Sequence, residues 1–475
     1  MFELEQLSRY LLVVSMLSDR RCGRIKTNRR NDMQIVQQLL FAVALGLTAW
    51  LMTKRINIIK KTIQLGKSEN RTDRPAERLG TMLRIAFGQK KMFDRPVVGF
   101  MHFVIYAGFL LINIEVLEII LDGLLGTHRL FASFLGSFYL ILIDFFEFLA
   151  VGVLTVCLIF LVRRNITKVE RLQASRHREM SGWAQLDGNL ILVIEIVLML
   201  AILSMNATDA ILQQRGVEHY HPVGDFFFSS FLQPIFSGLS DGALVAVERV
   251  AWWAHILGIF AFALYVTYSK HLHIFLAFPN TYFANLLPKG EMHNMPEITK
   301  EVKIMLGMEQ PDPNEPPAEI GRFGAKDVAD LNWKNLMDAY SCTECGRCTS
   351  ACPANITGKA LSPRKIMMDT RDRLEDVGKN MLANGGEFKD DGKSLLGDYI
   401  SEEEILACTT CNACVQECPI LISPLDIILQ LRRYKIMDEA QAPASWNAMF
   451  NNLETNQAPW KFSPSDRFNW ADDVK

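Results

Sequence analysis

The stretch Cys342-Thr-Glu-Cys345-Gly-Arg-Cys348-Thr-Ser-Ala-Cys352-Pro353 decides how the second half of this chain folds. It recurs as Cys408-Thr-Thr-Cys411-Asn-Ala-Cys414-Val-Gln-Glu-Cys418-Pro419, so both copies read C-x2-C-x2-C-x3-C-P, and together they hold eight of the ten cysteines. Three closely spaced thiolates can hold three corners of a cubane iron–sulfur cluster, and a distant cysteine supplies the fourth corner. The two runs therefore predict two [4Fe–4S] clusters.

The pairing of the two runs follows from the same chemistry. In two-cluster domains the fourth cysteine of each run ligates the cluster of the other run. We therefore predict one cluster at Cys342, Cys345, Cys348 and Cys418, and the second at Cys408, Cys411, Cys414 and Cys352.

Disulfides and zinc are the two alternatives for these cysteines. Disulfides are disfavoured if this part of the chain is cytosolic, because thiols are kept reduced there. Structural zinc sites favour pairs of C-x2-C separated by a longer loop. A third cysteine at the same short step, followed by Cys-Pro, does not match zinc spacing.

Composition divides the chain into two parts. The 475 residues carry a net charge of only −2, which suggests no nucleic-acid partner. Hydrophobic residues make up 49% of the chain but concentrate before about residue 285. We expect membrane residues 33–285, a linker over 286–325, a two-cluster domain over 326–440 and a C-terminal tail over 441–475. Residues 1–32 are interpreted as a non-structured extension or a mis-called start.

Five apolar runs are long enough to cross a bilayer as helices of about 20 residues. A sixth run, Phe226–Leu239, is short and interrupted by Pro234 and Gly238, so we expect an outer-face helix or a re-entrant segment. The predicted class is all-α: a five-helix transmembrane bundle followed by a cytoplasmic α-helical ferredoxin domain. The predicted spans are Met33–Met52, Pro96–Leu121, Phe138–Val162, Leu190–Leu212 and Leu244–Tyr268.

Orientation follows from the basic residues in the loops. Twelve Lys and Arg residues lie between the first two spans and six between spans 3 and 4, whereas the other two loops hold only Arg129 and Arg215. The basic loops should be cytoplasmic. This predicts a multi-pass protein of the cell (inner) membrane with its cysteine-rich domain in the cytoplasm.

Three histidines lie at suggestive places in the spans. His102 is near the cytoplasmic start of span 2, while His255 and His273 lie 18 residues apart near opposite ends of span 5. Such a separation is five helical turns, so both should share one helix face. We predict that His102 and His273 ligate one haem b, and that His255 is a candidate for a second. His271 is a rival for His273, and interfacial histidines without haem are the alternative. The partner of His255 stays open among His128, His219, His221 and Met205.

Several acidic residues also fall within spans, where charge is expensive and usually functional or paired. One interpretation is a proton path coupled to quinone chemistry. The other is hydrogen bonding between helices or ion pairing with Arg129 or Arg249. The residues are Glu115, Glu118, Asp144, Glu147 and Glu195.

The cysteine-rich half should be mostly helical. Helices are predicted over 327–340, 363–374 and 426–437, with a loop over 384–397. Ser401 and Glu404 form a capping box that should start a helix entering Cys408. The aromatic tail after 442 has no clear period.

The membrane half resembles the cytochrome b subunit of respiratory nitrate reductase and of membrane-bound heterodisulfide reductase. The resemblance rests on His102 in Gly-Phe-Met-His102 and on His255 and His273; Ile112 stands about where that family has a second histidine on span 2.

The C-terminal half is similar to the helical two-cluster ferredoxin domain of heterodisulfide reductase, glycolate oxidase and anaerobic glycerol-3-phosphate dehydrogenase. The similarity covers both cysteine runs, Ser362-Pro363-Arg364 and residues 456–466.

The combined resemblance implies a membrane-bound electron-transfer subunit of a respiratory oxidoreductase. Electrons would pass between a cytoplasmic partner, two [4Fe–4S] clusters, haem b and the quinone pool. Related chains often continue into cysteine-rich CCG domains, but no cysteine follows Cys418. The partner implied is a separate CCG-type iron–sulfur or flavoprotein subunit. The alternatives are a haem-free membrane-anchored ferredoxin module and a redox-sensing or assembly scaffold.

Overall fold

A computed structural model describes residues 34–173, 179–288, 290–311 and 321–474, so the interpretation of residues 1–32 lies outside the described residues. Over these ranges the chain is helical and forms no β-strand beyond two isolated bridges. The predicted all-α class is confirmed. The described residues form two compact units. We call 34–57, 89–173 and 180–272 the membrane unit, and 58–88, 179 and 273–474, with the gaps above, the cysteine unit.

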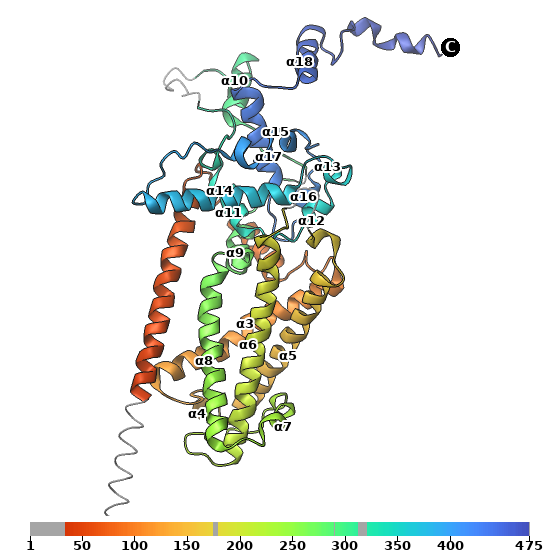
Figure 1. Cartoon of the computed structure of the whole chain (residues 1–475). Helices are drawn as coiled ribbons and strands as arrows, with labels where there is room; N and C mark the ends of the chain where they lie inside the picture. Colours follow the sequence, from red (N-terminus) through yellow and green to blue (C-terminus); the bar gives the residue numbers. More distant parts are fainter. Residues whose placement is uncertain (1–33, 174–178, 289, 312–320, 475) are drawn as a thin grey trace, which may run out of the picture. The chain divides into compact units, whose positions relative to one another are not determined.

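All five predicted spans exist as helices that are long and apolar enough to cross a membrane (Figure 1). Most of these helices are longer than the predicted runs, because their polar ends continue the helix beyond the apolar core. The last residues of the first helix, 58–64, belong to the cysteine unit. The helices are Gln34–Gln64, α3 (Pro96–Leu125), α5 (Ser137–Asn165), α6 (Trp183–Gln214) and α8 (Asp241–Val266).

The core of the membrane unit forms where these helices meet. Helix α6 packs against both α5 and α8, and α3 packs against α5 (Figure 1). Phe41 of the first span is fully buried among Trp252, Trp253 and Phe260 of α8, with ring centroids 5.6, 6.1 and 5.8 Å away. Aromatic contacts of this kind contribute beyond the area that they bury. They fix the first span against α8.

Short elements connect the spans. The run Phe226–Leu239 contains only a 3-10 turn and a four-residue helix, so it is not a span, as expected. These connecting elements are α4 (Ala132–Leu135), α7 (Gln233–Phe236) and the 3-10 turns Glu170–Leu172, Ser229–Phe231 and Lys270–Leu272.

Helix α8 ends at Val266, and this overturns one prediction about the histidines. The Ser269 hydroxyl donates to the Asp187 carboxylate at 2.7 Å, and the backbone N–H of Lys270 lies 3.3 Å from the same carboxylate. These hydrogen bonds to Asp187 of α6 hold residues 269 and 270 and compete with continuation of α8. His273 begins a separate helix, α9 (His273–Tyr282). The expectation that His255 and His273 share one helix face is therefore wrong.

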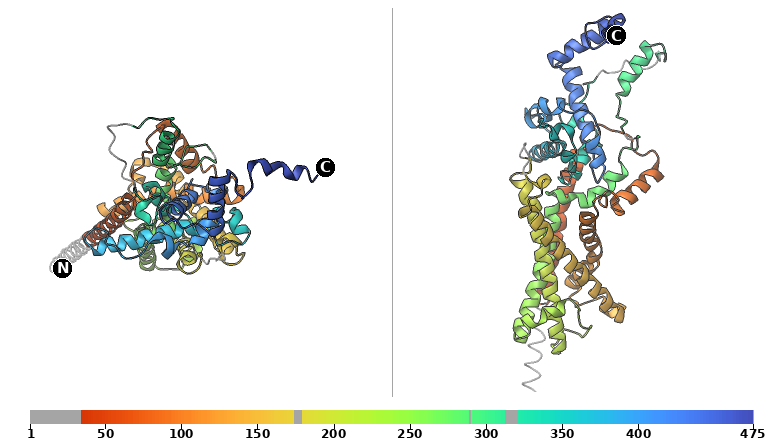
Figure 2. Two further views of the ribbon diagram at one scale, coloured as in Figure 1. Left: turned by 90° about the horizontal axis from the view of Figure 1, so that it is seen from above. Right: turned by 90° about the vertical axis from the view of Figure 1, so that its right-hand side faces the viewer.

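The cysteine unit is built from many short helices around one long one, α14 (Figures 1 and 2). Its elements are α2 (Pro75–Met82), α9, α10 (Pro296–Met305), α11 (Trp333–Ser341), α12 (Arg347–Ser350), α13 (Pro353–Ile356), α14 (Pro363–Ala383), α15 (Glu402–Leu406), α16 (Ala413–Glu417), α17 (Pro424–Arg433) and α18 (Ala444–Asn456), with π-helical turns at Leu83–Phe87, Leu395–Tyr399 and Tyr434–Asp438 and 3-10 turns at Val328–Asp330 and Pro464–Ala471.

In this unit, the predicted starts of helices are confirmed where the sequence contains a helix-capping residue. Ser401 and Glu404 form the predicted capping box at the start of α15. The helix predicted over 363–374 begins at Pro363 but continues to Ala383. Two segments without an obvious period are also helical: α10 lies in the expected linker and α18 in the expected tail.

The basic loop after the first span belongs to the cysteine unit rather than to the membrane unit, which differs from the ranges expected from the sequence. The guanidinium of Arg78 is buried and donates to the carbonyls of Ala284 at 3.0 Å and Tyr282 at 3.3 Å. The Trp333 indole donates to the carbonyl of Glu69 at 2.9 Å. Arg78, one of the basic residues used to predict the orientation of the spans, thus also holds this loop against the end of α9. The Glu69 carbonyl holds the loop against Trp333 of α11.

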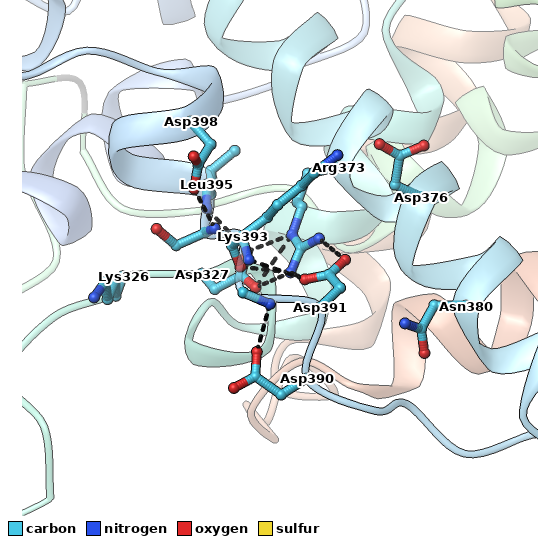
Figure 3. Close-up of polar contacts among 12 residues, drawn as sticks. Lys326, Asp327, Arg373, Asp376, Asn380, Asp390, Asp391, Lys393, Leu395 and Asp398 are labelled. Carbon is cyan, nitrogen blue, oxygen red and sulfur yellow. Dashed lines mark hydrogen bonds and ion pairs between the residues drawn. The ribbon is translucent and has the colours of Figure 1, made fainter.

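A buried arginine fixes the segment between the two cysteine runs. The side chain of Arg373 on α14 is fully buried and pairs with Asp327 and Asp391, each at 2.6 Å (Figure 3). It also donates to the carbonyl of Lys393 at 2.8 Å, and Asp327 in turn accepts from the backbone N–H of Leu395 at 3.0 Å. Arg373 therefore joins the chain before the first cysteine run to the loop before the second.

We expect Arg373→Met to destabilise the cysteine unit by about 3 kcal/mol, because it leaves two carboxylates facing an apolar side chain. The midpoint of urea-induced loss of the visible absorbance of the purified full-length protein measures this effect. Lys379→Met on the same helix is the control, since the Lys379 side chain is 72% exposed and its pair with Asp376 contributes about 0–1 kcal/mol. Equal midpoints for the two variants would contradict the assignment.

Candidate iron–sulfur site

The first predicted set of cysteines encloses a cavity. Its lining includes Cys342, Cys345 and Cys348 of the first run and Cys418 of the second. The rest of the lining is largely apolar, with Met367, Ile420, Ile422, Pro419 and Pro424. Cys418 of the second run thus lines the same cavity as three cysteines of the first run. This donor set fits a [4Fe–4S] cluster.

The second set is also brought together across the two runs. Burial first, and then the nearby Cys408 and Cys352, raise the pKa of the Cys414 thiol to about 12. Burial likewise raises the pKa of Cys352, and Cys408 and Cys411 act on it in the same direction. Cys352 therefore lies with the three cysteines of the second run. Helices α12 and α16, which follow the opening turns of the two runs, pack against each other.

The two runs share an unusual backbone conformation that their sequences only partly reveal. Glu344 and Gly346 in the first run have φ of 54° and 73°, and Thr410 and Asn412 in the second have 56° and 64°. In each run, the residues two and four positions after the first cysteine have a left-handed backbone conformation. Such a conformation can direct successive N–H groups to one side and form a concave site that binds anions. Glycine and asparagine tolerate this conformation, whereas Glu344 and Thr410 adopt it at a cost.

Backbone N–H groups point at the sulfurs in this arrangement. The N–H of Thr410 lies 3.4 Å from Sγ of Cys408, and that of Ile422 lies 3.3 Å from Sγ of Cys418. Such bonds stabilise thiolate and tune the potential of a bound cluster. In the described ranges, no three His, Cys, Asp or Glu side chains are placed to hold a single metal ion.

Burial governs the protonation of the free thiols. It raises the pKa of Cys342 and of Cys418 to about 12, and for Cys418 the neighbouring Cys345 adds to the increase. These thiols are therefore protonated at neutral pH before metal binds, and binding must displace their protons.

Buried ion pairs surround the first cavity. Arg364, which lines it, pairs with Glu179 at 2.8 Å, with both side chains 2% exposed. Glu344, in the turn between Cys342 and Cys345, pairs with Arg371 of α14 at 2.7 Å. Helix α14 thus supplies cations to the first cysteine run. Arg364 and Glu344 belonged to motifs singled out in the sequence, whereas Glu179 and Arg371 did not.

One contact chain that the sequence did not suggest joins α9 to the first cavity. Asn280 of α9 donates to the carbonyl of Ile420 at 2.9 Å, two residues after Cys418. Its amide oxygen accepts from Lys334 of α11 at 3.0 Å, and Lys334 pairs with Asp338. The Lys334–Asp338 spacing of four is visible in the sequence, but nothing there marks Asn280. Helix α9, which begins at His273, is therefore tied directly to the loop after Cys418.

The predicted histidines have different surroundings. His102 is half-buried on α3 in the membrane unit, whereas His273 begins α9 in the cysteine unit. His255 is 1% exposed on α8, and its Nδ1 lies 3.0 Å from the carbonyl of Leu198. Its Nε2 is buried and has no hydrogen-bond partner among the described residues. An Nδ1 that donates to a carbonyl leaves Nε2 as the lone-pair atom, which is the arrangement that metal-ligating histidines adopt.

The candidate partners of His255 also differ. His128 lies 3.4 Å from Asp209 through Nε2, and its ring contacts His219. Met205 is buried in the hydrophobic cluster that contains Trp252 and Ile256, which lie beside His255 in helix α8. Of the candidates left open by the sequence, Met205 has the surroundings closest to those of His255.

Comparison with known proteins supports the iron–sulfur assignment. Residues 341–422 match the family model of the 4Fe-4S dicluster domain. The chain is 28% identical over 473 residues to the probable iron-sulfur-binding oxidoreductase FadF of Bacillus subtilis, with 93% of this chain and 61% of that protein covered. It is 27% identical over 441 residues to the EtfAB:quinone oxidoreductase of Syntrophomonas wolfei, with 86% and 56% covered.

A shorter similarity covers part of the chain. It is 30% identical over 172 residues to a probable membrane-anchored ferredoxin of Chromohalobacter salexigens, which covers 32% of this chain and 24% of that protein. No solved structure gives a significant match. The chain spans 61% and 56% of the lengths of the first two relatives. The resemblance of the membrane half to nitrate reductase cytochrome b stays a prediction.

The cysteine cavity, the crossed runs and these similarities agree with one another. The chain carries a helical 4Fe-4S ferredoxin domain and has helices suited to a membrane. It is homologous to iron–sulfur oxidoreductases and, over a shorter stretch, to one component of the CoB-CoM heterodisulfide reductase of Methanosarcina acetivorans. Residues 341–422 are thus assigned to a 4Fe-4S dicluster domain.

Proposed function

We propose that this chain is the membrane-bound electron-transfer subunit of a respiratory oxidoreductase that links a cytoplasmic partner to the quinone pool. The observation that carries the proposal is the cavity lined by cysteines of both runs, together with the five apolar helices found among the described residues. The clusters and haem would supply one-electron chemistry, and the residues of this chain would hold and tune them.

The ligands that we propose for the clusters are those predicted from the spacing. Cys342, Cys345, Cys348 and Cys418 would hold the first cluster, in line with the cavity that they surround. Cys408, Cys411, Cys414 and Cys352 would hold the second. Cys411 is exposed, so the second set lies nearer to solvent than the first. We therefore propose that the soluble partner docks at the side of Cys411.

For haem b, we propose His102 and His273 as one ligand pair and His255 as a ligand of a second haem. Support for His255 is its buried Nε2 without a hydrogen-bond partner among the described residues. Support for His273 is its place on α9, because Asn280, about 10 Å further along that helix, bonds the loop after Cys418. A group held at His273 would thus be linked to the first cysteine set through one helix.

The orientation that we propose places both basic loops and the cysteines in the cytoplasm. Residues 58–88, which hold most of the first basic loop, form one compact unit with the cysteine-bearing segment. Glu179, which follows the second basic loop, pairs with Arg364 in the same unit. Segments that fold together lie on one side of a membrane, so these contacts favour the orientation derived from loop charge.

Quinone is proposed as the membrane substrate because one relative is named as an EtfAB:quinone oxidoreductase. Two relatives extend well beyond the part that this chain matches. As the cytoplasmic partner of this chain we propose a separate CCG-type iron–sulfur or flavoprotein subunit.

A second candidate is a haem-free ferredoxin held at the membrane. It is favoured by the similarity to a probable membrane-anchored ferredoxin and by the separation of His273 from the helix of His255. Haem content separates the two candidates, because both require the same iron.

Pairs of cysteine substitutions test the crossed ligation. Purified wild type should contain about eight non-haem irons per chain, and Cys418→Ser about four. The double variant Cys418→Ser/Cys342→Ser should also keep about four, because both substitutions affect one cluster. Cys418→Ser/Cys408→Ser should keep almost none. If the iron contents of the two double variants were exchanged, each run would ligate its own cluster.

Histidine substitutions test the haem ligands. We expect His273→Ala to lower the haem-to-protein ratio by about one, with a matching decrease of the reduced haem b band, while iron stays at about eight per chain. His271→Ala is the matched control and should keep the band. His255→Ala should lower the haem-to-protein ratio by about one. Wild type made with ample haem that holds full iron without haem would reject the haem proposal and support the membrane-anchored ferredoxin.

A further inference from the structure

One end of the membrane unit contains an unusual concentration of buried carboxyl groups. They come from α3, α5 and α6 and surround Arg129, which lies in the loop after α3 and is 7% exposed. Carboxyl groups in membrane-spanning helices are expensive and are kept only for pairing or function. The residues are Glu115, Glu118, Asp122, Glu147 and Asp209, and we call them the Arg129 cluster.

Two of the carboxylates on α3 have structural partners. Asp122 accepts from the hydroxyl of Thr127 at 2.5 Å and from the backbone N–H of Arg129 at 2.8 Å, so it closes the end of α3. Glu118 accepts from the Tyr139 hydroxyl at 2.8 Å and from the backbone N–H of Phe131 at 2.7 Å. For these two residues, hydrogen bonding between segments is a sufficient explanation.

The carboxylates on α5 and α6 are also paired. Glu147 accepts from the Asn206 amide at 3.0 Å and from the backbone N–H groups of Phe228 and Ser229 at 2.9 and 3.1 Å. Asp209 pairs with Arg129 at 2.7 Å. The interpretation that span acids serve interhelical bonding therefore holds for most of the cluster.

Glu115 is different. Its side chain is only 5% exposed, and its Oε1 is buried without a hydrogen-bond partner among the described residues. Leaving a buried polar atom unpaired costs about 1–3 kcal/mol, and more if the group is charged. Arg129, Glu118 and Glu147 are charged groups near enough to Glu115 to act on it electrostatically. A group held at such a cost needs a role beyond packing.

A polar connection leads from Glu115 towards the aqueous loops. Glu118 lies three residues further along α3, on the same side of the helix. Its partner Tyr139 is 3.3 Å from Arg129, which holds Asp209 in place. Asp209 in turn lies 3.4 Å from Nε2 of His128, whose ring contacts the exposed His219 at 5.5 Å between centroids. Arg129 keeps its proton throughout, so it orders this connection rather than carrying a proton.

We propose that Glu115 is a reversible proton-binding site, coupled through the Arg129 cluster to the aqueous end that carries His128 and His219. Its carboxylate takes up one proton from that end when the membrane unit gains an electron, and releases the proton when the electron leaves. The electron comes from quinol or from the reduced partner, so the coupling rests on the proposed function. The proton site itself does not depend on it.

The direct test is infrared difference spectroscopy of the full-length protein in lipid nanodiscs. A pH change should alter the C=O band of a protonated carboxyl group that shifts in heavy water, and Glu115→Gln should remove this band. Glu115→Asp should restore a band at a displaced frequency. Glu195→Gln is the control, because Glu195 is a span carboxyl outside the Arg129 cluster, and it should leave the band unchanged.

The redox step is tested on the same samples. Reduction of wild type should change the Glu115 band, and the pH dependence of the haem midpoint potential should be weaker in Glu115→Gln while the cluster EPR signals stay unchanged. A band that persists in Glu115→Gln, or that responds neither to pH nor to reduction, would overturn the proton site even if haem and iron are present. A pH-responsive band in protein without haem would keep the site and reject the proposed function.

Discussion

The cavity lined by cysteines of both runs is the constraint on which the cysteine unit depends. One tight turn can place three thiolates of a run, but Cys418 reaches the cavity of the first run from more than 50 residues away. The intervening chain must therefore leave the first turn and return to it with little freedom. Helix α14 leads the chain away from the first run. Arg373 of this helix then pairs with Asp391, in the loop before the second run, and with Asp327, before the first run. The ion pairs of Arg364 and Arg371 then place positive charge where thiolates would gather.

Much of this arrangement was predictable from the sequence because the relevant signals are local. Cysteine spacing specified the crossed cavity, apolar length specified five spans, and the pair Ser401 and Glu404 specified a helix start. These patterns each depend on a few neighbouring residues. The left-handed conformation of Glu344 and Thr410 was not predictable, because neither residue type favours it. The left-handed conformation is required by the way each cysteine run turns, which depends on the folded structure.

The expectation that His255 and His273 share one helix face failed for a tertiary reason. Counting 18 residues between His255 and His273 assumes an unbroken helix, and the sequence between them has no proline or glycine after Gly258. The helix ends at Val266 because Asp187, from another helix, binds Ser269 and Lys270. Periodicity within one segment carries no information about such a partner. The same limit applies to the span acids, since sequence alone could not separate the bonded Glu118 and Glu147 from Glu115.

The bond from Asn280 to Ile420 also has a consequence for how the protein is assembled. The loop after Cys418 owes its shape to the sulfur that it surrounds, and α9 owes part of its position to that loop. Because binding and folding are linked whenever a group binds only the ordered state, incorporation of iron also stabilises the placement of α9. Cluster loading would then also order the helix that begins at His273, so that the proposed haem ligand and the proposed cluster ligands would be organised together.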